Sequence, residues 1–330
     1  MDPYQIIGKR ILFSPLNWGL GHASRSAKLI HHLSKENTVV IASDGAALHW
    51  LSAEFPALPT IELPELKMRY SKRFGAIGGI IRRVPHFFRS IQRDYKAITK
   101  VLEKDNFDLI ISDNRYGVYN EQIPSYLITH QLRFMHPLSS MITGVLQNFI
   151  EKFDEVWVPD DAEHSLSGEL SQPENPLNVP LRFIGSLSRF NENREVSKDI
   201  KFLLIASGPE PFQSQMINYF EQNFLLLTHS CHIVSSTELS KEEGLSKNLV
   251  GHYKPDSNSL ELLIDRSEYV ICRSGYSSIM DLIKKNQRAI LIPTPGQIEQ
   301  IYLAKYHKDN PLFNCVLKSN DLSVYMKELM

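Results

Sequence analysis

The sequence predicts an α/β protein built from doubly wound parallel sheets. Short apolar runs rich in Ile, Leu and Val recur along the 330 residues, and segments with helical spacing separate them. The runs are continuous rather than alternating, which is typical of parallel strands covered by helices on both faces. Hydrophobic residues make up 42% of the chain and charged residues 22%, which is ordinary for a globular protein.

Ten strands are expected, five in each half of the chain. The first five are "RILFS" (10–14), "TVVIAS" (38–43), "FDLIISD" (107–113), "SYLITH" (125–130) and "EVWVPD" (155–160). The second five are "KFLLIAS" (201–207), "CHIVSS" (231–236), "NLVGHY" (248–253), "YVICRS" (269–274) and "AILIP" (289–293). Helices are expected between strands, for example at "ASRSAKLIHHLSK" (23–35) and "SSIMDLIKKN" (277–286).

A polar segment divides the chain into two domains. An apolar run ends at Gly185, and a polar stretch follows it before the strong strand that begins near residue 200. We therefore expect an N-terminal domain over 1–186, a linker over 187–198 and a C-terminal domain over 199–330. The two halves resemble each other, because each contains a strand, a turn with glycine and a helix.

The composition argues against several classes of protein. A net charge of -1 provides no global attraction to nucleic acid. The three cysteines, Cys231, Cys272 and Cys315, lie far apart and form no CxxC pair, which argues against a disulfide framework or a structural zinc. The first residues lack the features of a signal peptide, and no stretch approaches about 20 uninterrupted apolar residues. We therefore expect a cytoplasmic protein without a transmembrane helix.

One region departs from this neutrality. Segment 67–96 carries nine Lys or Arg residues against a single Asp, with apolar "AIGGII" and "HFF" between the charges. One interpretation is a solvated helix face next to a loop. The other is a peripheral contact with anionic lipid at the inner face of the membrane, or with a phosphorylated acceptor.

The stretch "LNWGLGHASRS" (16–26) lies where the first strand gives way to a helix. Gly19 and Gly21 would let the backbone approach a ligand, and His22 would lie in the first helical turn. The stretch does not match the dinucleotide-binding pattern GxGxxG, because Ser24 occupies the third glycine position. The sequence contains no GxxxxGK[ST] pattern either. A nicotinamide dehydrogenase and a P-loop protein are therefore disfavoured.

A second glycine turn, "CRSGYSSIMD" (272–281), precedes another expected helix. Gly275 is expected to permit the turn, and Ser277 and Ser278 would then aim hydroxyls and backbone amides at an anion. Asp281 follows about one helical turn later, where its carboxylate could hold the paired hydroxyls of a ribose. A phosphate next to a ribose indicates a nucleotide. The alternative is an ordinary capped helix.

The loop after the next strand adds polar groups at the same level. In "TPGQIEQIYLAKYH" (294–307), the side chains of Gln297, Glu299 and Gln300 gather at the carboxyl end of a strand. Open α/β sheets bind ligands at this place. Amides and carboxylates suit the hydroxyl groups of a sugar, so the two loops together suggest a nucleotide-sugar.

The stretches "GLGHASR" and "RSGYSSIMDLI…AILIPTPGQIEQIYLAKY" resemble the two-domain GT-B glycosyltransferases, and most of all the MurG-like group. The resemblance implies two Rossmann-like α/β domains that face each other across a cleft. The N-terminal domain would bind the acceptor, and the C-terminal domain would bind the nucleotide-sugar. The sequence departs from the MurG-like pattern at Leu303, where these proteins usually carry Asn before the residue that corresponds to Ala304.

The resemblance also implies roles for single residues. Asp281 matches the ribose-binding acid of the family, and Gln300 its sugar-contacting glutamine. Gly275 and Ser278 match its phosphate loop, and His22 matches the histidine that closes its first glycine turn. The donor-binding residues expected in this chain are Gly19, Gly21, Ser207, Gly208, Arg273, Ser274, Gly275, Ser277, Ser278, Asp281, Gln297, Glu299 and Gln300.

Sugar transfer requires a base for the acceptor hydroxyl and stabilisation of the leaving diphosphate. His22 is the best candidate base, because an ordinary imidazole titrates near neutral pH. Asp113 ends the strand "FDLIISD" and could orient the His22 ring. His130 is a third candidate that suits a structural role better. The sequence "PDDAE" (159–163) is interpreted as a helix cap rather than a metal-binding carboxylate pair, so no metal cofactor is expected.

The sequence thus predicts an inverting, metal-independent glycosyltransferase that uses a UDP-sugar such as UDP-GlcNAc, with a role in cell-envelope polysaccharide or glycolipid synthesis. Inversion is implied by the resemblance. Two alternatives stay open: a UDP-sugar 2-epimerase of the same fold, and a non-catalytic subunit that binds a nucleotide-sugar. The acceptor is expected to be a hydroxyl compound, lipid-linked if 67–96 docks on a membrane. No nucleic acid partner is expected.

Overall fold

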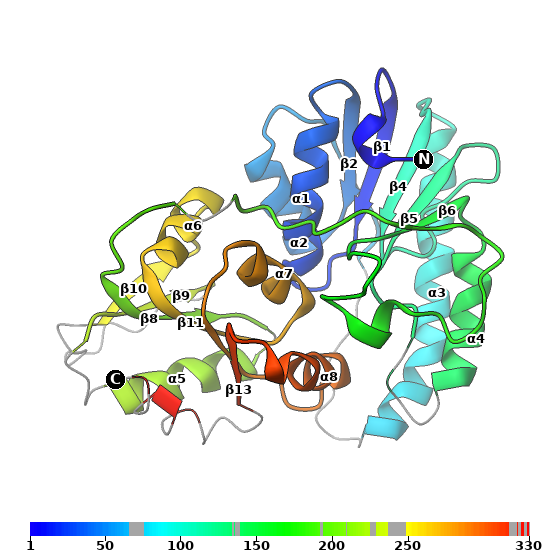
Figure 1. The fold of residues 1–330 in the computed structure, drawn as a ribbon. Helices are drawn as coiled ribbons and strands as arrows, with labels where there is room; N and C mark the ends of the chain where they lie inside the picture. The colour runs from blue at the N-terminus through cyan, green and yellow to red at the C-terminus, as the bar shows by residue number, and fades with distance from the viewer. Residues whose placement is uncertain are drawn as a thin grey trace. The chain divides into compact units, whose positions relative to one another are not determined.

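The chain forms two compact units in a computed structural model, Met1–Arg189 and Phe190–Met330 (Figure 1). The division falls inside the segment 187–198. The structure describes residues 1–65, 76–133, 135, 139–191, 194–208, 210–224, 229–236, 249–316, 322, 325–326 and 329. Each unit is a doubly wound α/β domain, so the fold class predicted from the sequence is confirmed.

The N-terminal unit contains a seven-stranded sheet in the order β3-β2-β1-β4-β5-β6-β7, and every neighbouring pair is parallel. Its strands are β1 (Arg10–Pro15), β2 (Thr38–Ser43), β3 (Thr60–Glu62), β4 (Leu109–Asp113), β5 (Ser125–Ile128), β6 (Glu155–Val158) and β7 (Leu181–Phe183). The five strands expected here are confirmed. Strands β3 and β7 have no apolar run that predicts them, because both are three-residue edge strands that stay partly exposed.

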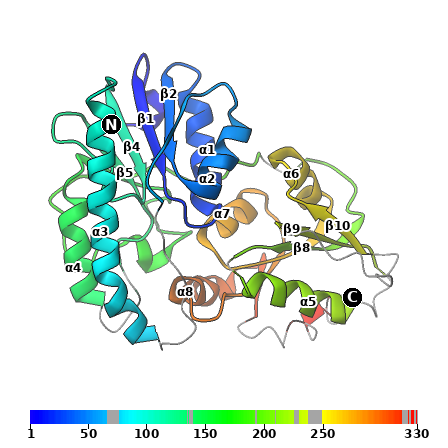
Figure 2. The same cartoon turned by 180° about the vertical axis from the view of Figure 1, so that it is seen from behind.

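Helices cover both faces of this sheet (Figures 1 and 2). They are α1 (Gly21–Leu33), α2 (Gly45–Glu54), α3 (Ala76–Leu102) and α4 (Ser139–Ile150), with short 3-10 helices at Pro3–Gln5 and Gly168–Ser171. The face under α3 and α4 has an apolar core in which Ile98 of α3 packs with Leu12 and Ile110 of the sheet. Leu146 of α4 packs with Leu127.

The C-terminal unit contains a six-stranded sheet in the order β10-β9-β8-β11-β12-β13, again parallel throughout. Its strands are β8 (Ile200–Ala206), β9 (Cys231–Ser235), β10 (Leu249–Tyr253), β11 (Ser267–Cys272), β12 (Ala289–Leu291) and β13 (Phe313–Cys315). Its helices are α5 (Phe212–Phe224), α6 (Ser257–Asp265), α7 (Tyr276–Lys284) and α8 (Ile298–Tyr306), with a 3-10 turn at His307–Asp309.

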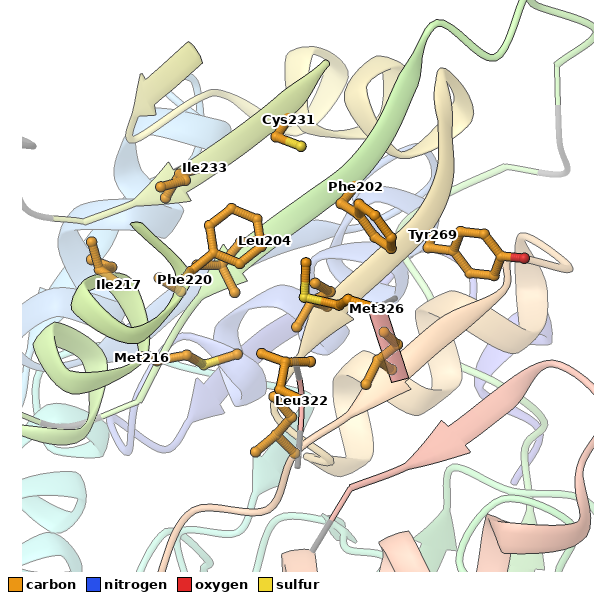
Figure 3. Close-up of a cluster of buried hydrophobic side chains, with 14 of the residues drawn as sticks. Phe202, Leu204, Met216, Ile217, Phe220, Cys231, Ile233, Tyr269, Leu322 and Met326 are labelled. Atoms are coloured by element: carbon orange, nitrogen blue, oxygen red, sulfur yellow. The ribbon is translucent and has the colours of Figure 1, made fainter. Parts of the chain in front are cut away.

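Figure 3 shows the core beneath α5, where Met216 and Phe220 of the helix pack against Leu204 and Ile233 of the sheet. The expectation of continuously buried strands is wrong for β10. This strand lies at the edge of its sheet, where Val250 is 41% exposed and Tyr253 is 51% exposed. An edge strand has a neighbour on one side only, so an apolar sequence does not ensure burial.

Two other expectations concern the basic segment 67–96 and the sequence "PDDAE" (159–163). Positions 67–75 of the basic segment 67–96 lie outside the described residues, and the rest of the segment begins α3. "PDDAE" does not cap an α-helix: the buried Asp160 carboxylate instead accepts hydrogen bonds from the backbone N–H groups of Leu166 and Ser167 within a loop. Over the part of the chain that the structure describes, no helix combines the length and apolar character needed to cross a membrane.

The order of the strands reverses at one place in each sheet. In the N-terminal unit the reversal lies between β1 and β4, and in the C-terminal unit it lies between β8 and β11. The loops that leave adjacent strands at such a point diverge to opposite faces and open a crevice at the carboxyl edge of the sheet. These two switch points are the places at which the sheet topology favours a ligand.

Candidate active site

The pairing of β1 with β4 brings His22 and Asp113 together. Pro15 at the end of β1 pairs with Asp113 at the end of β4, and the backbone N–H of Leu16 donates to the Asp113 carbonyl at 2.9 Å. Gly19 then turns the chain with a φ of +68°, in the left-handed region that favours glycine. The helix α1 begins two residues later at Gly21, so His22 lies in its first turn.

His22 and Asp113 form a hydrogen-bonded pair at this switch point of the sheet. The distance between His22 Nδ1 and Asp113 Oδ1 is 2.9 Å, and the two side chains are 15% and 0% exposed. A carboxylate can only accept a hydrogen bond, so the proton of a neutral His22 ring resides on Nδ1. The other ring nitrogen, Nε2, then has a lone pair and can accept a proton from a ligand.

Arg25 holds the Asp113 carboxylate from the other side. Its Nε donates to Asp113 Oδ2 at 2.8 Å, and its Nη2 donates to Oδ1. The Ser26 hydroxyl donates to Oδ2 at 2.9 Å. Burial alone would raise the pKa of Asp113, but the charges and hydrogen bonds of Arg25 and His22 outweigh it and hold the pKa well below its ordinary value. Asp113 is therefore an ionised, fixed carboxylate at neutral pH.

His130 belongs to the same cluster in an interior role. Its ring is buried, and its Nδ1 lies 2.9 Å from Arg25 Nη1. A guanidinium can only donate hydrogen bonds, so His130 Nδ1 accepts and carries no proton. This contact agrees with the structural role expected for His130.

A second buried network supports the loop in front of His22. Arg115 donates to Asp44 Oδ1 and to Asp94 Oδ1, each at 2.6 Å, and all three side chains are at most 2% exposed. Asn17, in the loop after β1, donates to Asp44 Oδ2 at 3.1 Å. The loop is thus anchored at its base, while Trp18 at its tip is 45% exposed.

Tyr116 is buried beside the cluster and makes the N-terminal unit sensitive to alkaline pH. Burial raises the pKa of its hydroxyl to about 12; the Asp113 charge adds to the rise, and the Thr129 hydrogen bond and the Arg25 charge oppose it. An unfolded tyrosine has a pKa of about 10. The folded state therefore holds the proton more tightly, and this stabilisation is complete below about pH 10 and is lost as the pH rises through about 12.

We expect Tyr116→Phe to remove this part of the alkaline destabilisation. The free energy of unfolding of the N-terminal unit should fall by about 2–3 kcal/mol less between pH 10 and 12 than in the wild type, since each pKa unit corresponds to about 1.4 kcal/mol. Urea titrations at several pH values would measure this through tryptophan fluorescence, because Trp18, Trp50 and Trp157 all lie in this unit. Tyr95→Phe is the control, and an equal pH dependence in the two variants would contradict the prediction.

In the C-terminal unit, the loops that follow β11 and β12 meet the first turn of α8 at the carboxyl edge of the sheet. The Ser274 hydroxyl, after β11, donates to the backbone carbonyl of Gln300 at 2.8 Å. The backbone N–H of Thr294, after β12, donates to Gln300 Oε1 at 2.7 Å. A Cβ atom at Gly275 would lie 3.9 Å from Gln300 Nε2. The carboxamide of Gln300 is therefore fixed next to the turn that begins α7.

The two glycines of this edge, Gly208 and Gly275, differ in backbone conformation. Gly208, after β8, has a φ of +102°, which other residues rarely adopt. Gly275 has a φ of -77° as the residue before α7, so the expectation that it permits the turn by its conformational freedom is wrong. A Cβ atom there would lie 3.9 Å from Gln300 Nε2, which is an ordinary contact distance.

Arg273 was expected to bind the donor, but its side chain is turned into the unit. It is 6% exposed, and its guanidinium donates to the carbonyl oxygens of Phe212 at 2.8 Å and of Pro293 at 3.3 Å. Burial lowers the pKa of this guanidinium from its ordinary value. Arg273 thus joins the segments that follow β8, β11 and β12, and it positions these loops.

The other expected donor residues lie along the same edge. Ser277, Ser278 and Asp281 lie on α7 within its first two turns, and all three are partly exposed. Gln297 immediately precedes α8, and Glu299 lies in its first turn. Ser207 and Gly208 follow β8 directly. Among the residues that the structure describes, no group of three or more His, Cys, Asp or Glu side chains is arranged to hold a metal ion.

Three residues at these sites are not predicted from the sequence: Arg25, Ser26 and Thr294. Arg25 stands three positions after His22, so the two share one face of α1, and this spacing was the available signal. An arginine on the buried face of a helix requires an anionic partner. Among the described residues, the buried hydroxyl of Thr294 has no hydrogen-bond partner, and it lies 3.9 Å from the position of a Cβ atom on Gly208.

Comparisons with known proteins agree with this architecture. Residues 188–326 match the profile of the glycosyltransferase family 28 C-terminal domain. Comparison with curated protein sequences gave no significant match.

Solved structures match the whole chain. MurG of Acinetobacter baumannii has a TM-score of 0.57 and 11% identity, and the match covers 98% of this chain and 90% of that one. Arabidopsis thaliana UGT89C1 complexed with UDP-L-rhamnose has a TM-score of 0.65 and 13% identity, and the match covers 98% of this chain and 90% of that one. The spinosyn rhamnosyltransferase SpnG complexed with thymidine diphosphate has a TM-score of 0.63 and 13% identity, and the match covers 97% of this chain and 91% of that one.

At this level of identity, the matches to solved structures show the fold, and the matched profile adds the type of the C-terminal domain. Both agree with the resemblance found in the two glycine-containing stretches. The C-terminal unit thus matches a glycosyltransferase family 28 C-terminal domain, and the whole chain has the two-domain GT-B fold of the solved glycosyltransferases, MurG among them.

Proposed function

We propose that the protein transfers a sugar from a UDP-sugar, such as UDP-GlcNAc, to a hydroxyl acceptor with inversion and without a metal ion. His22 acts as the general base in this proposal. The observation that carries it is the 2.9 Å contact between His22 Nδ1 and the buried Asp113 carboxylate at the switch point of the sheet. The contact leaves Nε2 of a partly exposed ring to accept a proton.

The proposed reaction is a single displacement at the anomeric carbon of the donor. His22 Nε2 takes the proton of the acceptor hydroxyl, and the acceptor oxygen forms a bond to the anomeric carbon of the donor. The bond between that carbon and the phosphate oxygen breaks, and its electron pair leaves with the nucleoside diphosphate. Asp113 stabilises the imidazolium that forms and keeps the ring in the orientation that points Nε2 away from the carboxylate.

The carboxyl edge of the C-terminal unit is the proposed donor site. Ser277 and Ser278 lie in the first turn of α7, where backbone N–H groups and the helix dipole favour a diphosphate. Asp281 would hold the ribose hydroxyls, and Gln300, fixed by the Thr294 N–H, would contact the sugar. Gly275 lies next to the Gln300 amide, where the turn before α7 would meet the ligand in this proposal.

The solved structures support a nucleoside diphosphate donor. One of them contains UDP-L-rhamnose and another contains thymidine diphosphate. Uridine and thymidine nucleotides with several sugars are therefore the donors to compare. The proposed acceptor carries a hydroxyl group. A lipid-linked acceptor is proposed only if the basic segment 67–96 binds a membrane. Positions 67–75 of this segment lie outside the described residues.

We expect UDP to raise the melting temperature of the protein more than GDP, ADP or NAD. Ligand at about 100 times its dissociation constant stabilises the native state by about 2.7 kcal/mol. Transfer would then be assayed by mass spectrometry with UDP-GlcNAc and UDP-L-rhamnose, with and without a panel of hydroxyl acceptors and in the presence of EDTA.

The outcomes of this assay separate the possible functions. A glycosylated product that forms only with an acceptor and persists in EDTA supports the proposal. Conversion of the donor sugar without an acceptor would instead identify an epimerase, and activity abolished by EDTA would contradict the metal-independent step. If no nucleotide stabilises the protein and no product forms, the proposed function is wrong.

A further inference from the structure

We propose that Arg25 is a positioning residue for the proposed reaction: it compensates the charge of Asp113 and so limits how strongly this carboxylate draws a proton onto His22. The inference rests on the proposed function, because it assigns Arg25 a part in controlling the proposed base. Arg25 does not touch the reacting atoms and acts through Asp113.

The contacts of Arg25 carry the inference. Its guanidinium binds both carboxylate oxygens of Asp113, and one of them, Oδ1, is the oxygen that accepts from His22 Nδ1. Its remaining terminal nitrogen, Nη1, donates to His130 Nδ1 at 2.9 Å. The side chain of Arg25 is 1% exposed and that of Asp113 is fully buried. The paired charges are therefore shielded from solvent, where electrostatic coupling is strongest.

Arg25 reduces the electrostatic effect of the Asp113 carboxylate on the His22 imidazole in this proposal. In a two-residue pair, the carboxylate charge favours the imidazolium and makes the imidazole a better base. Here Asp113 shares its charge with a guanidinium through two hydrogen bonds, so the carboxylate orients the ring more than it charges it. Removing the Arg25 charge would leave this carboxylate without a counterion beside the imidazole and would favour the imidazolium.

Other groups around His22 are consistent with this balance. Ser26 and Arg25 face Asp113 from α1. Tyr116, in the segment after β4, lies near Arg25 and Asp113. His130, in the segment after β5, contacts Arg25. His130 Nδ1 accepts from the Arg25 guanidinium, so a proton on this nitrogen would face the N–H of Arg25 Nη1. Arg25 is accordingly the cation that hydrogen-bonds to both oxygens of Asp113.

The pH dependence of kcat/KM tests the role of Arg25. Arg25→Gln keeps a hydrogen-bond donor and removes the charge, so the acidic limb of the profile should move up by about one pH unit. Arg25→Lys restores a positive charge and should bring the limb back toward the wild type. Asp113→Asn leaves Arg25 uncompensated and should move the limb to lower pH. Arg182→Gln removes a charge of the same unit that is 43% exposed, is paired with Glu155 and does not contact this pair, and the limb should stay in place.

A second readout does not depend on catalysis. NMR spectra of protein with ¹⁵N-labelled histidine report the protonated nitrogen and the titration midpoint of His22, with His22→Gln used for assignment. The wild type should show the proton of neutral His22 on Nδ1, and the midpoint should move in the same directions as the kinetic limb. If Arg25→Gln does not fold, the uncharged double variant Arg25→Gln/Asp113→Asn replaces it, and its midpoint should lie above that of Asp113→Asn.

The two readouts separate this inference from the proposed function. If the NMR midpoints move as expected but no sugar transfer occurs with any donor, the proposed function fails and the electrostatic role of Arg25 stands. If transfer occurs but the charge-removing variants leave the His22 titration within about 0.2 pH unit of its reference, Arg25 is only a structural brace and the inference is overturned.

Discussion

Replacing His22 with alanine is expected to lower kcat by about 10²- to 10⁴-fold, the range in which a general base contributes to catalysis. The nitrogen lost is Nε2, which faces away from Asp113 and is the proton acceptor in the proposed step. The donor site proposed on the C-terminal unit does not include His22. Nucleotide affinity, measured as the shift in melting temperature with UDP, should therefore change little while turnover falls.

The helix α1 offers a control for this experiment. His31 lies on the same helix near its C-terminal end and is exposed, so His31→Ala should keep the kcat of the wild type. His22→Gln fills the space of the ring without providing a base and should be as inactive as the alanine variant. If His22→Ala keeps its activity within about threefold, the lost stabilisation is under about 1 kcal/mol and another group must take the proton.

The sequence allowed the fold to be predicted because buried parallel strands have a strong apolar signal. The ten runs of Ile, Leu and Val all became strands. The strands that gave no signal, β3, β7 and β13, are three residues long. Two of these, β3 and β7, are partly exposed at their sheet edges, so their formation depends on pairing with a neighbouring strand rather than on their own apolar residues.

The candidate site was predictable only as far as strand ends determine it. The carboxyl ends of parallel strands lie at one edge, so His22 and Asp113 could be placed in proximity from sequence alone. Whether a charged side chain at such an edge turns outward or inward is decided by its partners. Arg273 finds two backbone carbonyl oxygens and turns inward, and Arg25 finds Asp113. These partners are distant in the sequence, and no local pattern indicates them.

The buried charges of the N-terminal unit have a structural consequence beyond the proposed chemistry. Arg115 neutralises Asp44 from the end of β2 and Asp94 from α3, and Asp44 in turn holds Asn17 in the loop before His22. Burial raises the pKa of Asp94, and the Arg115 charge opposes this rise. The network thus connects two strand ends, a helix and the loop that positions the proposed base.

Arg115→Met is therefore expected to destabilise the N-terminal unit by about 3–5 kcal/mol, because it leaves buried carboxylates without a counterion. Urea unfolding followed by tryptophan fluorescence measures this, since the three tryptophans lie in this unit. Arg133→Met, which removes a more exposed pair with Glu169, should cost less than about 1 kcal/mol. Adding Asp44→Asn and Asp94→Asn to Arg115→Met should recover part of the loss. A cost for Arg115→Met no larger than that for Arg133→Met would show that the buried network does not stabilise the unit.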